Sequence, residues 1–383
     1  MFSVRKACSS LKAEVIVVDN NSSDGSRNIL QEEFKDVTFV WKNTNDGFGK
    51  ACNEGVELAK GEVIVFLNPD TIVSEDCFLK CISFIQTKSD CGALGVKMLD
   101  GSGVFLPESK RGFPTPSAAF FRLTGLTYLF PQSPFFSAYY AGHLSEHQVQ
   151  EIDVIAGAFF MVRKKVLTVV GGFDEDFFMY GEDVDLSYRI QKAGFKNYYY
   201  PQTTIIHFKG ESTLKSKAYL RHFYDAMYLF IKKHYRGLIQ ILMMRFAILL
   251  GKWIATVQLV VKPQKLKQAL PPAEAAVVCA QEEFSNLIHI IKHAVPSILI
   301  RGRIAVNFYD QQNVIGIVDD LPVLFDKGIK HFVLSEGVLS FKEIISVMDK
   351  FSRKCCFMVH ADGSHSIVGS DDKSTRGYVI AAR

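Results

Sequence analysis

The sequence lacks several features that would place it among secreted, zinc-binding or nucleic-acid-binding proteins. Its eight cysteines are scattered over 383 residues, with no Cys-x-x-Cys pair and no histidine partner at zinc-finger spacing. This pattern argues against a disulfide framework and a structural zinc site, and it is typical of a protein in a reducing cytosol. The net charge is only +4, an excess too small to indicate a nucleic-acid-binding surface. We therefore expect no nucleic-acid partner.

Apolar residues, in contrast, are abundant. They make up 48% of the chain, which is enough for the cores of two domains. Short β-rich runs at 14–18, 37–41 and 62–67 alternate with helical stretches near 26–34 and 48–60. This alternation predicts an α/β fold with a mostly parallel sheet flanked by helices on both faces. In such sheets, ligands bind beyond the carboxyl ends of the strands.

The run FLNPD at 66–70 predicts a strand that ends abruptly in a polar turn. Pro69 cannot donate to a sheet ladder and Asp70 is costly to bury alone, so the strand must end with a carboxylate at its tip. One carboxylate beside Asn68 is a poor metal site by itself. Mg²⁺ or Mn²⁺, however, commonly takes one or two protein ligands and completes its shell with water and substrate phosphates. The run thus indicates either a turn or a metal site for a phosphorylated substrate.

Two other segments place small and polar residues at expected strand ends or helix starts. In VVDNNSSDGS, Asp19 ends a strand, and the turn and cap formers after it could hold its carboxylate toward the crevice. In NTNDGFGKACNEG, glycines such as Gly47 allow a ligand or a neighbouring strand close to the backbone. Taken alone, each segment is explained by an ordinary connection between strand and helix.

A cluster of carboxylates opens a later helix. YGEDVDLSYR places Glu182, Asp183 and Asp185 in the first turn, where the positive helix end favours ionised carboxylates and one of them could accept a hydroxyl proton. Surface helices often begin with acidic residues, but the large apolar residues of GGFDEDFFMY just before would bury this helix start. His207, which ends the strand-like run in IIHFKG, could complete a metal site or contact a diphosphate, although most such histidines are hydrogen-bonded fillers.

Taken together and in this order, these segments resemble the family 2 glycosyltransferases, especially the bacterial rhamnosyltransferase-like branch. The resemblance spans about residues 3–215 and rests on six motifs in register: VVDNNSSDGS, NDGFGKACNEG, FLNPDT, GAFFMVRK, GGFDEDFFMYGEDVDLSYRIQKAG and HFKG. It implies a GT-A fold and inverting transfer of a sugar from a nucleotide-diphosphate donor, dTDP-rhamnose or a UDP-sugar. The implied acceptor is a hydroxyl group of a lipid-linked or polysaccharide molecule.

The resemblance also implies roles by position. Asp183 would be the catalytic base, with Glu182 as its neighbour in a Glu-Asp pair. Asn68-Pro69-Asp70 stands where the family has its Asp-x-Asp motif, so Asp70 would bind Mg²⁺ or Mn²⁺, with His207 as a second contact to metal or diphosphate. The metal would neutralise the departing diphosphate while the base acts on the attacking oxygen. The other implied contacts are with the donor nucleotide, at Asp19, Asn21, Gly47, Asn53 and Asn68, and with the sugar and acceptor, at Gly157, Ala158, Asp174 and Glu175.

One departure from the family concerns the first strand. Family members begin with a further strand, ending in a Tyr-Asn-like turn, that forms part of the nucleotide pocket. This sequence opens with a helix, indicated by the spacing of Val4, Cys8 and Leu11. We expect the upstream reading frame to encode about 20–30 further residues with a β-branched run, and residues 1–383 alone to be poorly soluble or inactive. The alternative function is a non-catalytic sugar-nucleotide-binding or scaffold protein of a polysaccharide-assembly complex.

The most apolar stretch lies at 236–262. Arg245, Lys252 and Thr256 fall along one helical face. This pattern fits an amphipathic helix at an anionic membrane surface and equally a core helix, whereas the two central charges disfavour a spanning helix. The first interpretation would make the protein cytoplasmic and peripheral at the inner face of the cell membrane. The basic residues that flank the stretch are Lys232, Lys233, Arg236, Lys262, Lys265 and Lys267.

Four regions are predicted along the chain. They are an N-terminally incomplete glycosyltransferase domain at 1–235, the apolar helix at 236–262, a proline-rich linker at 263–274 and a smaller α/β domain at 275–383. The last region lacks the Gly-x-Gly-x-x-Gly of dinucleotide sites in its first turn, so we expect a docking or oligomerisation role for it. Within the first region, residues 101–150 are rich in Gly, Pro, Phe and Tyr and predict a long mobile loop beside the crevice.

Overall fold

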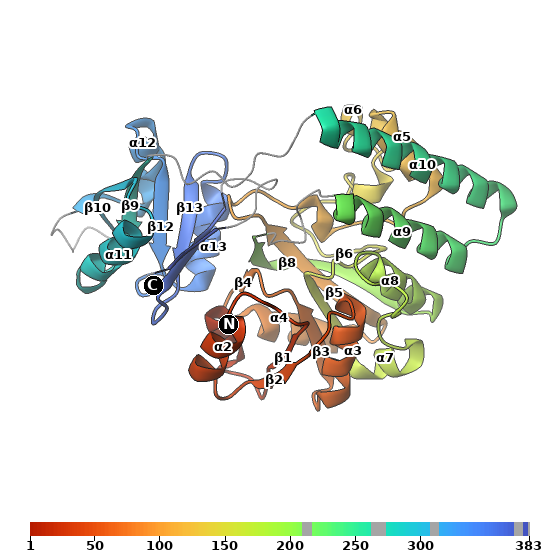
Figure 1. Ribbon diagram of the computed structural model, residues 1–383, viewed down its shortest axis with the longest axis horizontal. Helices are drawn as coiled ribbons and strands as arrows, with labels where there is room; N and C mark the ends of the chain where they lie inside the picture. The colour runs from red at the N-terminus through yellow and green to blue at the C-terminus, as the bar shows by residue number, and fades with distance from the viewer. Residues whose placement is uncertain (209–216, 262–272, 307–313, 371–377, 382–383) are drawn as a thin grey trace.

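The computed structural model describes residues 1–208, 217–261, 273–306, 314–370 and 378–381 (Figure 1). Up to residue 261, the helices are α1 (Phe2–Cys8), α2 (Ser26–Glu33), α3 (Phe48–Leu58), α4 (Cys77–Thr87), α5 (Pro116–Leu123), α6 (Leu126–Leu129), α7 (Lys164–Val170), α8 (Glu182–Lys192), α9 (Lys217–His234) and α10 (Leu238–Val261). The strands there are β1 (Ile16–Asp19), β2 (Thr38–Trp41), β3 (Val63–Leu67), β4 (Thr71–Val73), β5 (Cys91–Leu99), β6 (Gln150–Glu151), β7 (Phe159–Arg163) and β8 (Lys196–His207).

The predicted α/β class is confirmed. A central sheet has the strand order β3-β7-β5-β8-β4, with β6 paired to β8. Helices α1 and α4 pack on one face, where the side chains of Ala7, Phe78 and Ile85 are buried against the strands. Helices α3, α7 and α8 cover the other face, where Leu167 and Ile190 belong to the core. The sheet is therefore a buried layer between two layers of helices.

The directions of the strands differ from the expectation of a mostly parallel sheet. Only the pair β5–β8 is parallel within the central sheet, and the other described pairs are antiparallel. The reason lies in the connections. The three-residue turn after Leu67 leads into β4, and the long connection before β7 brings that strand back antiparallel to β3, with Phe159 opposite Leu67. The parallel pair β1–β2 forms a separate two-stranded sheet.

The segment 101–150 is not the long loop that its composition predicts. It contains α5, which begins with Pro116 and is capped by the hydroxyl group of Thr115 accepting from the N–H of Ala118, and the short helix α6. An aromatic cluster holds the segment together, with the ring of Phe121 4.8 and 4.9 Å from the rings of Phe135 and Phe136. Aromatic pairs at this spacing stabilise one another beyond their buried area, so packed helical segments stand where a loop was expected.

Residues 238–261 of the apolar stretch form α10, which packs beside α9 (Figure 1). Met244 and Ile248 are buried against Ile231 of α9, so one side of α10 is a core helix as one interpretation predicted. The other side is exposed. No helix of the described residues is long and apolar enough to cross a membrane. Some of the predicted features lie outside the described residues. They are Lys209 and Gly210 of the HFKG motif, the flanking residues Lys262, Lys265 and Lys267, and the linker as far as residue 272.

Beyond residue 272 a second sheet forms, with the strand order β11-β10-β9-β12-β13-β14-β15. Its helices are α11 (Gln281–Ala294), α12 (Leu321–Asp326) and α13 (Phe341–Lys350). Its strands are β9 (Ala273–Val278), β10 (Ile298–Ala305), β11 (Val314–Ile317), β12 (His331–Ser335), β13 (Cys356–His360), β14 (Ser366–Gly369) and β15 (Tyr378–Ala381). Neighbouring strands are parallel along β11-β10-β9-β12-β13. The pairs β13–β14 and β14–β15 at the other edge are antiparallel.

The C-terminal sheet packs onto the central sheet through α13. Ile72 of β4 and Ile206 of β8 share one apolar cluster with Ile344 and Met348 of α13. The carboxylate of Glu75 accepts from the first two backbone N–H groups of α13, at 2.7 and 3.0 Å. A negative group at this helix end satisfies orphan donors and complements the helix dipole. The packing and the cap together fix α13 against the strands that carry Thr71 and His207.

Candidate active site

The first part of the site lies where the turn between β3 and β4 meets the end of β8. Thr71 stands opposite His207 across the antiparallel pair, and the N–H of Phe208 donates to the carbonyl oxygen of Asp70 at 2.9 Å. This pairing brings Nε2 of His207 to 3.2 Å from a carboxylate oxygen of Asp70. The side-chain nitrogen of Asn68 lies 3.5 Å from the same Nε2 atom. The two residues predicted to bind metal are therefore neighbours.

The donor set fits Mg²⁺ or Mn²⁺. Adjacent corners of an octahedron with bonds of about 2.1 Å are about 3 Å apart, close to the separation of the Asp70 and His207 atoms. Both side chains are partly exposed and accessible to water and phosphate oxygens. Within the described ranges, no cluster of three or more His, Cys, Asp or Glu side chains is arranged to hold a metal. A metal ion held by Asp70 and His207 would therefore need water and substrate oxygens as its other ligands.

The second part of the site is the start of α8. Oδ2 of Asp183 accepts from Nη2 of Arg111 at 2.5 Å and from the backbone N–H of Gly157 at 3.0 Å. Oδ1 accepts from the N–H of Val184 at 2.8 Å. Burial opposes the charge of Arg111, but the neighbouring Asp183 outweighs this effect and the pKa of Arg111 is raised. The Asp183 carboxylate is thus held in one orientation beside a fixed positive charge.

Glu182, the residue next to Asp183, has opposite surroundings. It is only 7% exposed, and burial together with the charge of Asp183 raises the pKa of Glu182 to about 8. Its Oε2 atom is buried and has no hydrogen-bond partner in the part of the chain that the structure describes. At neutral pH, Glu182 therefore keeps its proton in most molecules.

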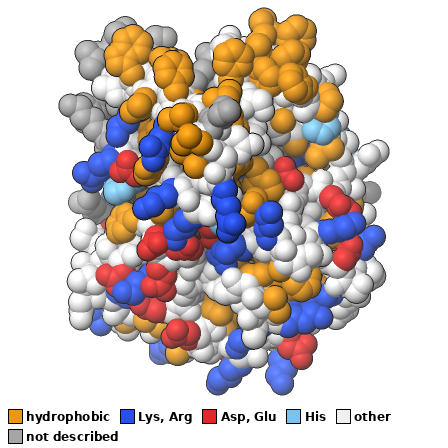
Figure 2. All heavy atoms as spheres, turned by 90° about the vertical axis from the view of Figure 1, so that its right-hand side faces the viewer, with side chains coloured by type: hydrophobic (Ala, Val, Ile, Leu, Met, Phe, Trp, Pro, Cys, Tyr) orange, Lys and Arg blue, Asp and Glu red, His pale blue; other side chains and the backbone are white. Residues whose placement is uncertain are grey.

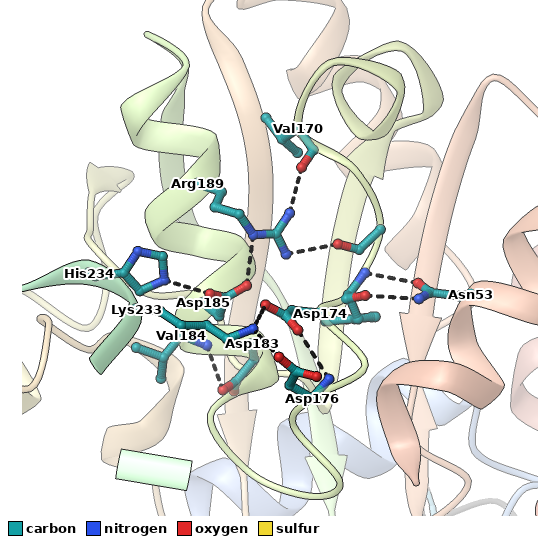
Figure 3. A network of polar contacts seen from close by, with 12 residues as sticks. Asn53, Val170, Asp174, Asp176, Asp183, Val184, Asp185, Arg189, Lys233 and His234 are labelled. Atoms are coloured by element: carbon teal, nitrogen blue, oxygen red, sulfur yellow. Dashed lines mark hydrogen bonds and ion pairs between the residues drawn. The ribbon is translucent and has the colours of Figure 1, made fainter. Parts of the chain in front are cut away.

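Asp185 is also part of a packed network rather than an open group (Figure 3). It accepts from Nε of Arg189 at 2.7 Å and lies 2.6 Å from Nε2 of His234. Burial would raise the pKa of Asp185, but the hydrogen bond with His234 and the charge of Arg189 outweigh it and lower the pKa. Arg189 also donates to the backbone oxygens of Val170 and Gly172. Asp185 therefore ties α8 to α9 and to the loop after α7.

The turn before β7 joins the two parts of the site. The backbone oxygen of Ala158 accepts from the N–H of Asn68 at 3.1 Å, and the adjacent Gly157 donates to Asp183. The predicted sugar and acceptor residues Gly157 and Ala158 thus lie between the turn that carries Asp70 and the start of α8. One short backbone segment sets the spacing of the two carboxylates.

The remaining residues predicted to contact sugar or nucleotide are held by protein partners. The amide of Asn53 donates to the backbone oxygen of Phe173 at 2.8 Å and to Glu175 at 3.0 Å, and it accepts from the N–H of Phe173 (Figure 3). Asp174 forms an ion pair with Lys233 of α9. These residues join α3 and α9 to the loop before α8.

The predicted nucleotide contacts at the end of β1 form a compact turn. Oδ1 of Asp19 accepts from the N–H of Ser22 at 2.9 Å, and Asn21 has φ = +68°. Gly47, which precedes α3, has φ = +95°, and a Cβ atom there would lie 2.5 Å from the backbone oxygen of Phe178. Glycine is therefore required at this close approach.

Arg111 and His234 are the site residues that the sequence did not indicate. Arg111 sits in the Gly-rich and Pro-rich segment, where no periodicity predicts which side chains turn inward. His234 ends a helix distant in sequence from Asp185. The only available signal was that a cluster of buried carboxylates requires cations nearby.

The fold and the candidate site are those of an α/β protein with Asp70 and His207 paired at a sheet tip and with an oriented carboxylate, Asp183, at the start of α8. Residues 2–170 match the family model described as glycosyl transferase family 2, so this part of the chain is similar to the enzymes of that family.

Curated relatives extend the match. The N-acetylglucosaminyl-diphospho-decaprenol L-rhamnosyltransferase of Mycobacterium tuberculosis is 28% identical over 235 residues, covering 58% of this chain and 76% of the relative. The rhamnosyltransferase WbbL of Escherichia coli K12 is 28% identical over 235 residues, covering 57% of this chain and 84% of the relative. Among solved structures, the mannosyltransferase PcManGT from Pyrobaculum calidifontis, in complex with GDP-Man and Mn²⁺, is similar with a TM-score of 0.38 and 15% identity, covering 66% of this chain and 67% of that one.

Proposed function

We propose that the protein transfers a sugar, with inversion, from a nucleotide-diphosphate donor to a hydroxyl group of a lipid-linked or polysaccharide acceptor in cell-envelope glycan assembly. The names of the relatives favour L-rhamnose as the sugar and a diphosphate-linked lipid as the acceptor. The observation that most supports this proposal is the backbone segment at 157–158, which is hydrogen-bonded both to the turn that contains Asp70 and to the carboxylate of Asp183. We place the reaction at the cytoplasmic face of the membrane.

The residues present support a single displacement. The acceptor hydroxyl oxygen attacks the anomeric carbon while the bond from that carbon to the diphosphate oxygen breaks. Asp183 takes the hydroxyl proton, and Gly157 and Arg111 hold its carboxylate in position. Asp70 and His207 would hold Mg²⁺ or Mn²⁺, which supplies charge neutralisation for the leaving diphosphate. Inversion of the anomeric centre requires the base and the leaving group to act from opposite sides of the sugar.

Glu182 has a supporting role in this proposal. Because its pKa is raised to about 8, it adds no second negative charge beside Asp183 at neutral pH. Two ionised carboxylates this close would repel one another and the diphosphate. Protonated Glu182 leaves Asp183 as the ionised acceptor of the pair.

The test is titration calorimetry with dTDP- and UDP-sugars in the presence and absence of Mn²⁺, followed by assays of donor hydrolysis and of transfer to a short polyprenyl-diphosphate-sugar acceptor. We expect metal-dependent donor binding and product with the inverted anomeric configuration. Binding without turnover on any donor and acceptor would favour the alternative, a non-catalytic sugar-nucleotide-binding or scaffold protein.

A further inference from the structure

The outer side of α10 is an apolar stripe that no element among the described residues covers. Leu238, Leu242, Phe246, Leu249 and Trp253 follow one another at intervals of three or four residues, which places them on one helix face. Phe246 is 68% exposed and Trp253 is 65% exposed. The opposite side of the helix is packed on α9, so the stripe is a fixed surface of the folded protein.

A second group of exposed apolar side chains comes from the segment around α5 and α6. It consists of Phe120, Tyr128, Leu129, Phe130 and Phe135, with Leu129 71% exposed. The segment is anchored, because α5 packs on α10 and the hydroxyl group of Thr127 donates to the backbone oxygen of Phe136 at 2.8 Å. We call this group and the α10 stripe together the apolar platform.

Positive charge accompanies the apolar platform. Between Lys217 and Trp253 the sequence has seven Lys and Arg residues and one acidic residue, Asp225. Between Pro116 and Ser145 it has no acidic residue. Figure 2 shows apolar side chains gathered along the upper edge of this face above a band of Lys and Arg side chains. Arg245 lies beside the stripe, where its guanidinium donates to the hydroxyl group of Tyr228 at 2.8 Å.

We propose that the apolar platform docks onto the surface of an anionic lipid bilayer, with α10 and α6 lying in the interface plane. Large exposed apolar patches mark interaction sites, and exposed aromatic residues beside cations suit the boundary between acyl chains and anionic headgroups. A second copy of this chain fits less well, because face-to-face pairing would bring two cationic bands together. α10 does not need to span the bilayer for this contact.

The apolar platform is mechanically connected to the candidate active site through α9. Lys233 and His234, at the end of α9, contact Asp174 and Asp185, and α10 packs along the same helix. Docking would therefore present the site at a fixed height above the lipid. This last step rests on the proposed function, since it matters for a lipid-linked acceptor, whereas the docking itself does not.

The experiment is vesicle flotation of the full chain without donor, using vesicles of phosphatidylcholine alone or with 30% phosphatidylglycerol, at low and high salt. Two double variants change the platform: Phe246→Gln with Trp253→Gln on α10, and Tyr128→Ser with Leu129→Gln on α6. The control is the single variant Val169→Gln on α7, where Val169 is as exposed as the platform residues. We expect each platform variant to reduce partitioning into anionic vesicles at least tenfold and the control to leave it unchanged. Thermal melts verify that all variants fold.

A fluorescence measurement tests the geometry independently. The chain has two tryptophans, so Trp41→Phe leaves Trp253 as the single reporter, and lipids brominated in their acyl chains should quench its emission. Binding that the platform variants do not weaken, or Trp253 emission that bound vesicles do not quench, overturns the proposal. Equal binding to neutral vesicles overturns its anionic part, and variants that only dissociate a dimer assign the surface to self-association instead. None of these results bears on transfer to a soluble acceptor, so they do not decide the proposed function.

Discussion

The two ends of the candidate active site are built in different ways. At the start of α8, each carboxylate has a dedicated environment: Asp183 faces Arg111, Asp185 faces Arg189 and His234, and Glu182 is buried with its proton. At the sheet tip, Asp70 and His207 are partly exposed on a turn and a strand end. Fixed charges suit a base that must keep one position through each turnover. Accessible ligands suit a metal and a diphosphate that enter and leave together.

The largest effect is expected at the α8 end. Asp183→Asn preserves the shape of the side chain but removes the proton acceptor, so transfer should fall about 10²–10⁴-fold. Donor binding measured by calorimetry should stay within a few fold, because Asp183 acts on the acceptor oxygen. Asp176→Asn, on an exposed carboxylate of the neighbouring loop, is the matched control. Full activity of Asp183→Asn would reassign the base, with Glu182 and Asp185 as the next candidates.

At the sheet tip, the same class of change should affect binding first. Asp70→Ala removes one of two protein ligands, and we expect metal-dependent donor binding to weaken about 10–100-fold, with a smaller loss for His207→Ala. Calorimetry at several Mn²⁺ concentrations measures both. The control Asp90→Ala removes a partly exposed carboxylate near the opposite end of β8. Donor binding that stays equally metal-dependent in Asp70→Ala would move the metal elsewhere.

A subtler change separates orientation from charge at Asp183. Arg111→Gln removes the positive neighbour, and we expect kcat to fall about tenfold while KM for the donor changes little. Arg111→Lys, which keeps the charge, should restore most of kcat. If both variants lose activity equally, Arg111 has a purely structural role.

The last expected effect concerns stability rather than turnover. The folded-state pKa of Glu182, about 8, lies above its unfolded value of about 4.3, so the folded protein binds the extra proton and loses stability as pH rises between these values. The slope is at most about 1.4 kcal/mol per pH unit. Glu182→Gln should remove this pH dependence. The melting temperature of the variant should therefore rise relative to that of the wild type as pH increases from 5 to 8. Parallel curves for the two proteins would contradict the buried, protonated state of Glu182.

Local sequence patterns predicted the element ends at which these candidate residues lie. A proline after an apolar run marked the sheet tip, and acidic residues after GGFDEDFFMY marked the start of α8. These features are encoded within a few residues, and they place Asp70, Glu182 and Asp183 at element ends whatever the rest of the chain does.

Features that depend on distant contacts were not predictable in the same way. Arg111 reaches Asp183 across 72 positions of sequence, from a segment whose aromatic packing no period reveals. The antiparallel directions of β3 and β4 follow from the connections and not from the strands themselves. The partners of Asn53 and Asp174 likewise appear only when α3 and α9 meet the loop before α8.

The cap that Glu75 provides to α13 affects how the protein unfolds locally. Strands β4 and β8 have the sheet-tip ligands at their ends and share an apolar cluster with α13, while Lys97 of β5 forms an ion pair with Asp349 of the same helix at 2.6 Å. Amide protons of β4 and of the last residues of β8 should therefore exchange with deuterium only in openings that also detach α13. On the proposed assignment, Asp70, His207 and the C-terminal sheet then belong to one cooperative unit, and binding of Mn²⁺ and donor should also slow exchange in α13.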